Sequence, residues 1–139
     1  MHFDLVDSVI ELDAAAGRIV TVKNVSAAEE YLQDHFPTFP VLPGVLMIES
    51  LTQAARKLLT AMNPAHSRHV LCGVRALKYG NFVRPGETLR VEVKLTKQQE
   101  DGRFDFSGTG VVLRSGANAQ EEPPTAVSGK FSMRPARLG

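Results

Sequence analysis

The sequence predicts an α+β fold in which an antiparallel sheet of about six strands wraps around one long central helix. Residues 45–62 carry apolar side chains at a spacing of three or four, which is the helical period. Residues 87–98 instead alternate apolar and polar side chains, which is typical of a strand with one buried face. At 139 residues, and without repeats, the chain suits one domain over residues 1–139.

Strands are expected on both sides of the helix. The first two cover residues 5–12 and 18–25, with a turn at Gly17 between them. Four more follow the helix, at residues 69–79, 87–98, 103–114 and 125–133. In the strand at 87–98, one face is apolar and is made by Leu89, Val91, Val93 and Leu95. Gly108 and Gly110 indicate a bulge or a close backbone approach in the next strand.

The predicted helix begins after Pro43-Gly44 and ends at Asn63-Pro64. Its first half is apolar on nearly all sides, so we expect other structure to enclose it. Glu49 lies inside this apolar run, where an isolated carboxylate is costly unless it is paired or serves chemistry. The helical apolar positions include Val45, Ile48, Leu51, Ala55, Leu58 and Met62.

Composition restricts the classes of function. The 16 basic and 15 acidic residues give a formal net charge of +1, which disfavours a nucleic-acid-binding protein. The sequence has no run of 18 apolar residues and no basic-then-apolar signal pattern, so we expect no membrane insertion and a cytoplasmic location. The single Cys72 excludes an intrachain disulfide and is expected to be a small hydrophobic strand residue. His66 and His69 have no companion ligands, so we expect solvated loop residues rather than a metal site.

The segment that carries Glu49 resembles the signature of the FabZ family of 3-hydroxyacyl-[acyl-carrier-protein] dehydratases. The matching residues are His35-Phe36-Pro37, Pro40, Pro43-Gly44-Val45-Leu46, Ile48-Glu49 and Gln53, with 14 positions from His35 to Glu49. Lys78-Tyr79 and the Pro-Gly-acidic turn at 85–87 match a second part of the family pattern. The resemblance implies a hot-dog fold, in which two subunits pair to complete the sites. Departures from the family pattern are Asp34, Thr38-Phe39 and Phe82.

Dehydration of a 3-hydroxyacyl thioester divides into three tasks. His35 can remove the C2 proton, because neutral imidazole is a good base near pH 7. Glu49, among apolar residues, can hold a proton for the leaving hydroxyl group. Gly44 can bind the thioester oxygen, because unpaired N–H groups at a helix start favour developing negative charge. Gln53 lies one turn beyond Glu49 and either orients its carboxyl group or serves only as a buried hydrogen-bond bridge.

The resemblance also implies partners and further contacts. It implies no metal, no organic cofactor, an acyl carrier protein that presents the substrate, and a homodimer or a trimer of dimers. The candidates for lining the acyl tunnel are Phe36, Phe39, Val41, Leu42 and Tyr79. The candidates for contact with the acidic carrier protein are Arg56, Lys57, Lys78 and Arg84, although ordinary surface charge explains any one of them equally well.

We therefore expect reversible dehydration of (3R)-3-hydroxyacyl-[acyl-carrier-protein] to the trans-2-enoyl form in fatty acid biosynthesis. Glutamate at position 49 favours, through the resemblance, the branch that does not isomerise the double bond. Three alternatives stay open: a hot-dog acyl thioesterase, a specialised or coenzyme A-linked dehydratase, and a non-catalytic acyl-binding homologue. The His35–Glu49 spacing disfavours the thioesterase, and the presence of both an acid and a base disfavours the binding module. The specialised dehydratase would carry the same motif.

Overall fold

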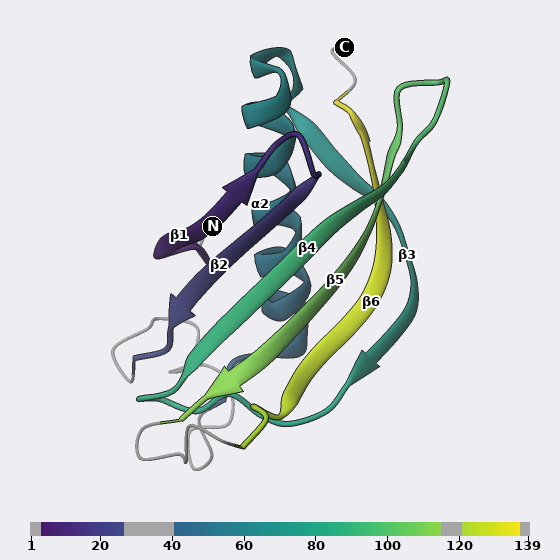
Figure 1. The fold of residues 1–139 in the computed structure, drawn as a ribbon. Helices are drawn as coiled ribbons and strands as arrows, with labels where there is room; N and C mark the ends of the chain where they lie inside the picture. The colour runs from purple at the N-terminus through teal and green to yellow at the C-terminus, as the bar shows by residue number, and fades with distance from the viewer. Residues whose placement is uncertain (1–3, 27–40, 115–120, 137–139) are drawn as a thin grey trace.

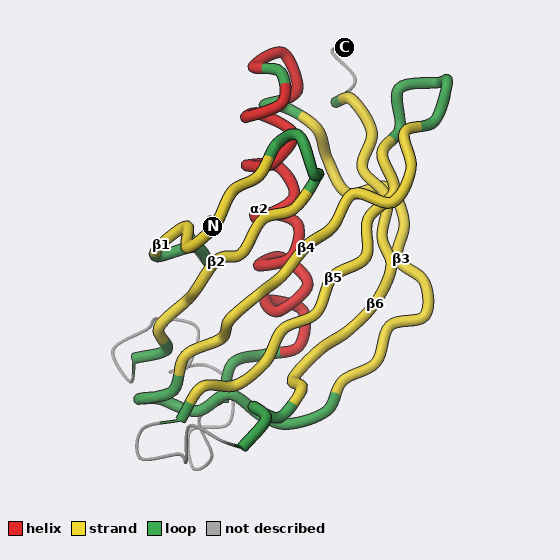
Figure 2. Tube along the Cα trace, viewed as in Figure 1, coloured by secondary structure: helices red, strands yellow, loops and turns green. Residues whose placement is uncertain are grey.

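One antiparallel sheet and one long helix form the core of the molecule. The computed structural model describes residues 4–26, 41–114 and 121–136. The described residues form strands β1 (Ser8–Asp13), β2 (Arg18–Asn24), β3 (His69–Tyr79), β4 (Thr88–Gln98), β5 (Phe104–Leu113) and β6 (Thr125–Pro135), helix α2 (Gly44–Met62) and the short 3-10 helix η1 (Pro64–His66). The sheet order is β1-β2-β4-β5-β6-β3, and the sheet curves along α2 (Figures 1 and 2). The α+β prediction is confirmed.

The N-terminal part of the chain differs most from the prediction. The sequence predicts a strand over residues 5–12, but β1 pairs with β2 only from Ser8 onward. Leu5 and Val6 are buried ahead of β1, and the Leu5 main chain hydrogen-bonds to side chains of α2 instead of to a strand. Asp7 donates its N–H to the Val22 carbonyl at 2.8 Å, which brings the chain into the sheet.

The core lies between the concave face of the sheet and one face of α2. Leu89, Val91 and Val93 are fully buried, which confirms the predicted apolar face of β4. On α2 the buried apolar positions are Met47, Leu51, Ala54, Ala55, Leu58 and Leu59. The first turn of α2 departs from the expectation of full enclosure, because Val45 is 69% exposed in the single chain. Met47, two positions further on, is buried in the core instead.

Two glycines of β5 allow the helix and neighbouring strands to approach closely. A Cβ at Gly108 would lie 3.0 Å from the Leu51 side chain on α2. A Cβ at Gly110 would lie 2.9 Å from side-chain atoms of both Leu89 and Val127. The predicted close approach is therefore confirmed, and the β5–β6 register shifts immediately after Gly110.

The prediction for His69 is wrong, and the structure adds a detail to the prediction for Cys72. His69 is not a solvated loop residue, because it begins β3 and is only 4% exposed. Its ring centroid lies 4.9 Å from that of His66, and burial, followed by the nearby His66, lowers the pKa of His69. Cys72 lies in a strand, as predicted, but its side chain is exposed, because the middle of β3 lies at the sheet edge.

Candidate active site

The start of α2 offers backbone N–H groups to a ligand. The helix begins at Gly44, directly after Pro43, which has no side-chain oxygen to cap it. The Pro43 carbonyl accepts the N–H groups of Leu46 at 3.0 Å and Met47 at 3.2 Å, so the N–H groups of Gly44 and Val45 lie ahead of the first helical bonds. Such N–H groups, at the positive end of the helix dipole, stabilise negative charge on a nearby oxygen.

An apolar cavity of about 350 Å³ lies against this helix start. Its walls come from α2, from the segment before it, from the end of β3 and from the beginning of β6. Its size and apolar walls suit part of an acyl chain. The residues that line it are Val41, Leu42, Pro43, Gly44, Met47, Tyr79, Gly80, Asn81, Phe82 and Ala126.

Four of the predicted site residues therefore meet at one cavity, namely Gly44, Val41, Leu42 and Tyr79. The predicted tunnel residues Phe36 and Phe39 and the predicted base His35 lie outside the described residues. Sequence reasoning missed other lining residues, including Met47 and Phe82. The position of Met47 follows from helical spacing, because three residues after Gly44 place it on the same side of α2.

Tyr79 covers the helix start. A Cβ at Gly44 would lie 2.8 Å from Cζ and 3.2 Å from Oη of Tyr79, so the phenol ring touches the Gly44 main chain. Burial raises the pKa of Tyr79, so the phenol keeps its proton across the neutral range. Glycine at position 44 is thus required for this close contact, and among the described side chains that line the cavity Tyr79 brings the one hydroxyl group.

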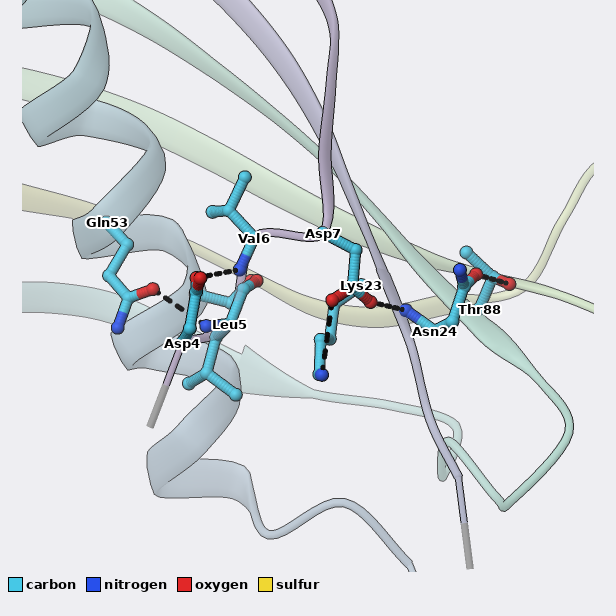
Figure 3. A network of polar contacts seen from close by, with 9 residues as sticks. Asp4, Leu5, Val6, Asp7, Lys23, Asn24, Gln53 and Thr88 are labelled. Carbon is cyan, nitrogen blue, oxygen red and sulfur yellow. Dashed lines mark hydrogen bonds and ion pairs between the residues drawn. The ribbon is translucent and has the colours of Figure 1, made fainter. Parts of the chain in front are cut away.

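Glu49 lies on another face of the same helix. The Gln53 side chain donates from Nε2 to Oε1 of Glu49 at 3.3 Å. Gln53 in turn accepts the Leu5 N–H through Oε1 at 2.8 Å, as Figure 3 shows. Gln53 therefore contacts the carboxyl group and also bridges to the main chain, and its orienting role stays a prediction.

Within one chain, Glu49 lies on a different side of α2 from the cavity. Successive helical residues are rotated by about 100°, so the five positions from Gly44 to Glu49 amount to about 500°, or about 140° around the helix. The two positions from Met47 to Glu49 correspond to about 200°. Glu49 accordingly does not line the cavity that Gly44 and Met47 share. One chain brings Gly44 together with Tyr79, but not with Glu49.

The four predicted carrier-binding cations do not form one patch. Arg56 is half-buried and donates from Nε to the His69 carbonyl at 3.0 Å, so it connects α2 to the start of β3. Lys57 is exposed beside it. Lys78 and Arg84 are exposed near the other end of β3. Lys78 lies nine positions after His69, which corresponds to about 30 Å along the strand. Of the four, Lys78 and Arg84 are near the cavity in sequence, one position before Tyr79 and two positions after Phe82.

The described residues form neither a metal-binding group nor a membrane-spanning helix. Residues 4–26, 41–114 and 121–136 contain no group of three or more His, Cys, Asp or Glu side chains placed to hold a metal ion. Within the same ranges, none of the helices has the length and apolar character needed to cross a membrane.

Two curated proteins similar to this chain carry the name of a dehydratase. A protein of Ruminiclostridium cellulolyticum named 3-hydroxyacyl-[acyl-carrier-protein] dehydratase FabZ is 43% identical over 94 residues, which cover 67% of this chain and 66% of that protein. The FabZ dehydratase of Solibacter usitatus is 34% identical over 135 residues, which cover 89% of this chain and 82% of that protein. The chain thus spans about two thirds or more of the length of these two relatives.

Solved structures show the same fold at low sequence identity. The dehydratase heterocomplex ApeI:P from Xenorhabdus doucetiae matches with a TM-score of 0.62 at 19% identity, covering 91% of this chain and 96% of that chain. An acyl-CoA hydrolase from Bacillus cereus matches with a TM-score of 0.66 at 13% identity, covering 89% and 68%. At these identities the likeness concerns the hot-dog fold alone.

A family model of dehydratases matches most of the chain. The model described as ApeI-like, ApeI dehydratase, matches residues 11–117, which include the start of α2, Glu49 and Gln53. This match covers well over half of the chain, and the similar curated proteins carry dehydratase names as well. The chain therefore belongs to the ApeI-like family of dehydratases.

Proposed function

We propose that this protein reversibly dehydrates (3R)-3-hydroxyacyl-[acyl-carrier-protein] to the trans-2-enoyl form in fatty acid biosynthesis. The observation that carries the proposal is the apolar cavity that ends at the Gly44 main chain, at the positive end of α2. An acyl chain in this cavity brings its thioester oxygen to N–H groups suited to an enolate-like charge. The dehydratase family and the FabZ names of the relatives support the same reaction.

The reaction assigns a proton to each of two side chains. Neutral His35 takes the C2 proton, and electron density moves onto the thioester oxygen, which the Gly44 N–H stabilises. Protonated Glu49 then gives its proton to the C3 hydroxyl group, which leaves as water while the C2–C3 double bond forms. The Gln53 amide holds Glu49 during this step. The role given to His35 rests on its spacing to Glu49 in the sequence.

We propose a homodimer as the minimal active unit. The position of Glu49 supports this, because it is not among the described residues that line the cavity, although the reaction needs its carboxyl group at a substrate bound there. A second copy can supply its Glu49 to the cavity of the first, and a two-fold axis then makes two equivalent sites. The exposure of Val45 at 69% is consistent with a partner against the first turn of α2.

We further propose that an acidic acyl carrier protein, in the cytoplasm, delivers the substrate. Lys78 and Arg84 are the better candidates for this contact, because they are exposed and lie within two positions of the cavity residues Tyr79 and Phe82. Arg56 is a weaker candidate, because its guanidinium group already hydrogen-bonds to the His69 carbonyl.

The test is turnover of a 3-hydroxyacyl thioester. We expect interconversion with the enoyl thioester, followed by absorbance of the conjugated bond, and no release of thiol. Glu49→Gln should abolish it, whereas Glu100→Gln, at an exposed carboxylate, should not. Release of thiol would instead identify a thioesterase. Inactivity with carrier-protein-linked chains would contradict the proposal, and activity restricted to coenzyme A thioesters would identify the specialised dehydratase.

The dimer has its own test. When inactive His35→Ala and Glu49→Gln proteins exchange subunits at equal amounts, half of the dimers are mixed and each mixed dimer holds one intact site. The expected recovery is therefore about 25% of wild-type activity. Native mass spectrometry verifies the exchange, and no recovery after verified exchange would contradict a site shared between subunits.

A further inference from the structure

The main chain at Leu5 is held by two polar side chains of α2. Ser50 donates from Oγ to the Leu5 carbonyl at 3.1 Å, and Gln53 accepts the Leu5 N–H at 2.8 Å. We infer that this Leu5 clamp, meaning the Leu5 main chain with Ser50 and Gln53, positions the acidic group of Glu49, and that Ser50 is a positioning residue for the dehydration. The inference rests on the proposed function.

The clamp fixes which way the Gln53 amide points. The Leu5 main-chain nitrogen can only donate, so the Gln53 atom that faces it must be the amide oxygen. The NH₂ group then has to face Glu49, as the 3.3 Å contact between Nε2 and Oε1 indicates. Because Oε1 of Glu49 accepts this hydrogen bond, the proton that Glu49 gives to the leaving hydroxyl group is carried on Oε2 of Glu49. A reversed Gln53 amide would turn its own oxygen toward Oε1 of Glu49, and the proton would then no longer be directed to Oε2.

The Ser50 hydroxyl group makes its hydrogen bond outside its own helix. Serine and threonine in helices commonly return their hydroxyl hydrogen bond to the carbonyl four residues earlier. Thr52 does this with the Ile48 carbonyl at 3.0 Å. Ser50 instead hydrogen-bonds to Leu5, 45 positions away in the sequence, although it is just as buried, at 1% exposed against 2% for Thr52. Its hydroxyl therefore joins two separate parts of the fold.

The other side of the clamp is anchored in the sheet. The Leu5 side chain is fully buried in the core, and Asp7 accepts the Asn24 N–H at 2.6 Å. Asn24 in turn accepts the Thr88 hydroxyl at 2.8 Å, which extends the network to β4 (Figure 3). The buried Lys23 side chain lies 3.5 Å from the Asp7 carboxylate. The Leu5 main chain is thus a fixed reference for Gln53, between α2 and β2.

Ser50→Ala tests this role, with Thr52→Val as the matched control. Both variants remove one buried hydroxyl group from the same part of α2, but only Ser50→Ala releases the clamp. We expect kcat to fall about 10-fold in Ser50→Ala with KM changed less than about 2-fold, because a neutral hydrogen bond that acts on the transition state has about this effect. Thr52→Val should keep kcat within about 2-fold of wild type.

The Glu49→Gln background separates positioning from a general structural effect. If Ser50 acts through Glu49, Ser50→Ala should not lower the residual rate of Glu49→Gln any further. An equal loss in both backgrounds, or no loss in either, would overturn the inference while leaving the proposed function intact. Absence of turnover in the wild-type protein would instead refute the proposed function.

A second measurement tests the same role of Ser50 if the residual rate of Glu49→Gln is too low to detect. The Gln53 side-chain NH₂ group should exchange its protons slowly in wild type and in Thr52→Val, because the clamp and Glu49 hold it. We expect the exchange observed by NMR to be at least about 10-fold faster in Ser50→Ala. Unchanged exchange in a folded Ser50→Ala protein would show that Ser50 does not fix the amide, and the inference would fail.

Discussion

Replacing Gly44 with alanine tests whether a thioester oxygen reaches the start of α2. The new Cβ would lie 2.8 Å from Cζ and 2.9 Å from Cε1 of Tyr79, whereas ordinary van der Waals contact begins at 3.4 Å. The ring must therefore retreat by about 0.6 Å. Tyr79 is 50% exposed and lies beside a cavity of about 350 Å³, so the ring has room to move without the backbone.

The fold should tolerate this substitution while activity does not. Alanine is favoured over glycine in a helix by about 1 kcal/mol, which offsets the displacement of the ring, so the free energy of unfolding should change by less than about 1 kcal/mol. The methyl group, however, occupies the approach to the Gly44 N–H. Loss of one oxyanion donor costs at least about 100-fold, so we expect kcat/KM to fall by about 100-fold, or about 2.7 kcal/mol.

The assay is enoyl absorbance at limiting substrate, with urea denaturation to check folding. Gly73→Ala is the matched control, because a Cβ at Gly73 meets no atom within 4 Å. Tyr79→Ala in combination with Gly44→Ala separates two causes of the loss. If displacement of the ring were responsible, the double variant would match Tyr79→Ala alone; our reasoning predicts that it stays about 100-fold lower. Wild-type kcat/KM in a folded Gly44→Ala protein would refute the reasoning.

Two further predictions concern stability. Gly80→Ala would place a Cβ 2.4 Å from the Thr125 carbonyl oxygen, so the free energy of unfolding should fall by about 1–3 kcal/mol in urea denaturation, and a change no larger than in Gly73→Ala would contradict the contact. Burial, followed by the nearby His66, lowers the pKa of His69 in the folded protein below the ordinary value of 6.5. The contribution of neutral His69 to the free energy of unfolding is therefore complete above pH 6.5 and is lost as the pH falls through the lowered pKa of the folded protein. The urea midpoint should therefore differ less between about pH 7.5 and about pH 5 in His69→Leu than in wild type.

Local patterns were sufficient to predict the helix and most strands. The apolar positions of α2 and the alternation in β4 are set by neighbouring residues, and both elements begin and end within one residue of the predicted bounds. The same holds for residue types with an obvious chemical use, because Gly44 at a helix start and Glu49 in an apolar run are visible in the sequence. The structure confirms that Gln53 contacts Glu49.

Contacts between distant parts of the chain could not be predicted in this way. Leu5 lies 48 positions from Gln53, and it contributes main-chain atoms, which carry no residue-type signal. The burial of His69 and the exposure of Cys72 depend on where β3 lies in the sheet, and strand periodicity alone does not say which strand is at the edge. Phe82 became a cavity residue only once α2 and the end of β3 were brought together.

The two proposals together make a prediction about which subunit the Leu5 clamp serves. If each site combines His35 of one chain with Glu49 of the other, the clamp that positions Glu49 belongs to the chain that does not supply the base. In mixed dimers of His35→Ala and Glu49→Gln, the intact site uses Glu49 of the His35→Ala chain. Adding Ser50→Ala to that chain should lower the recovered activity about 10-fold, whereas adding it to the Glu49→Gln chain should leave the recovery unchanged. Equal losses from both placements would mean that Ser50 supports the dimer as a whole and not the acid of one site.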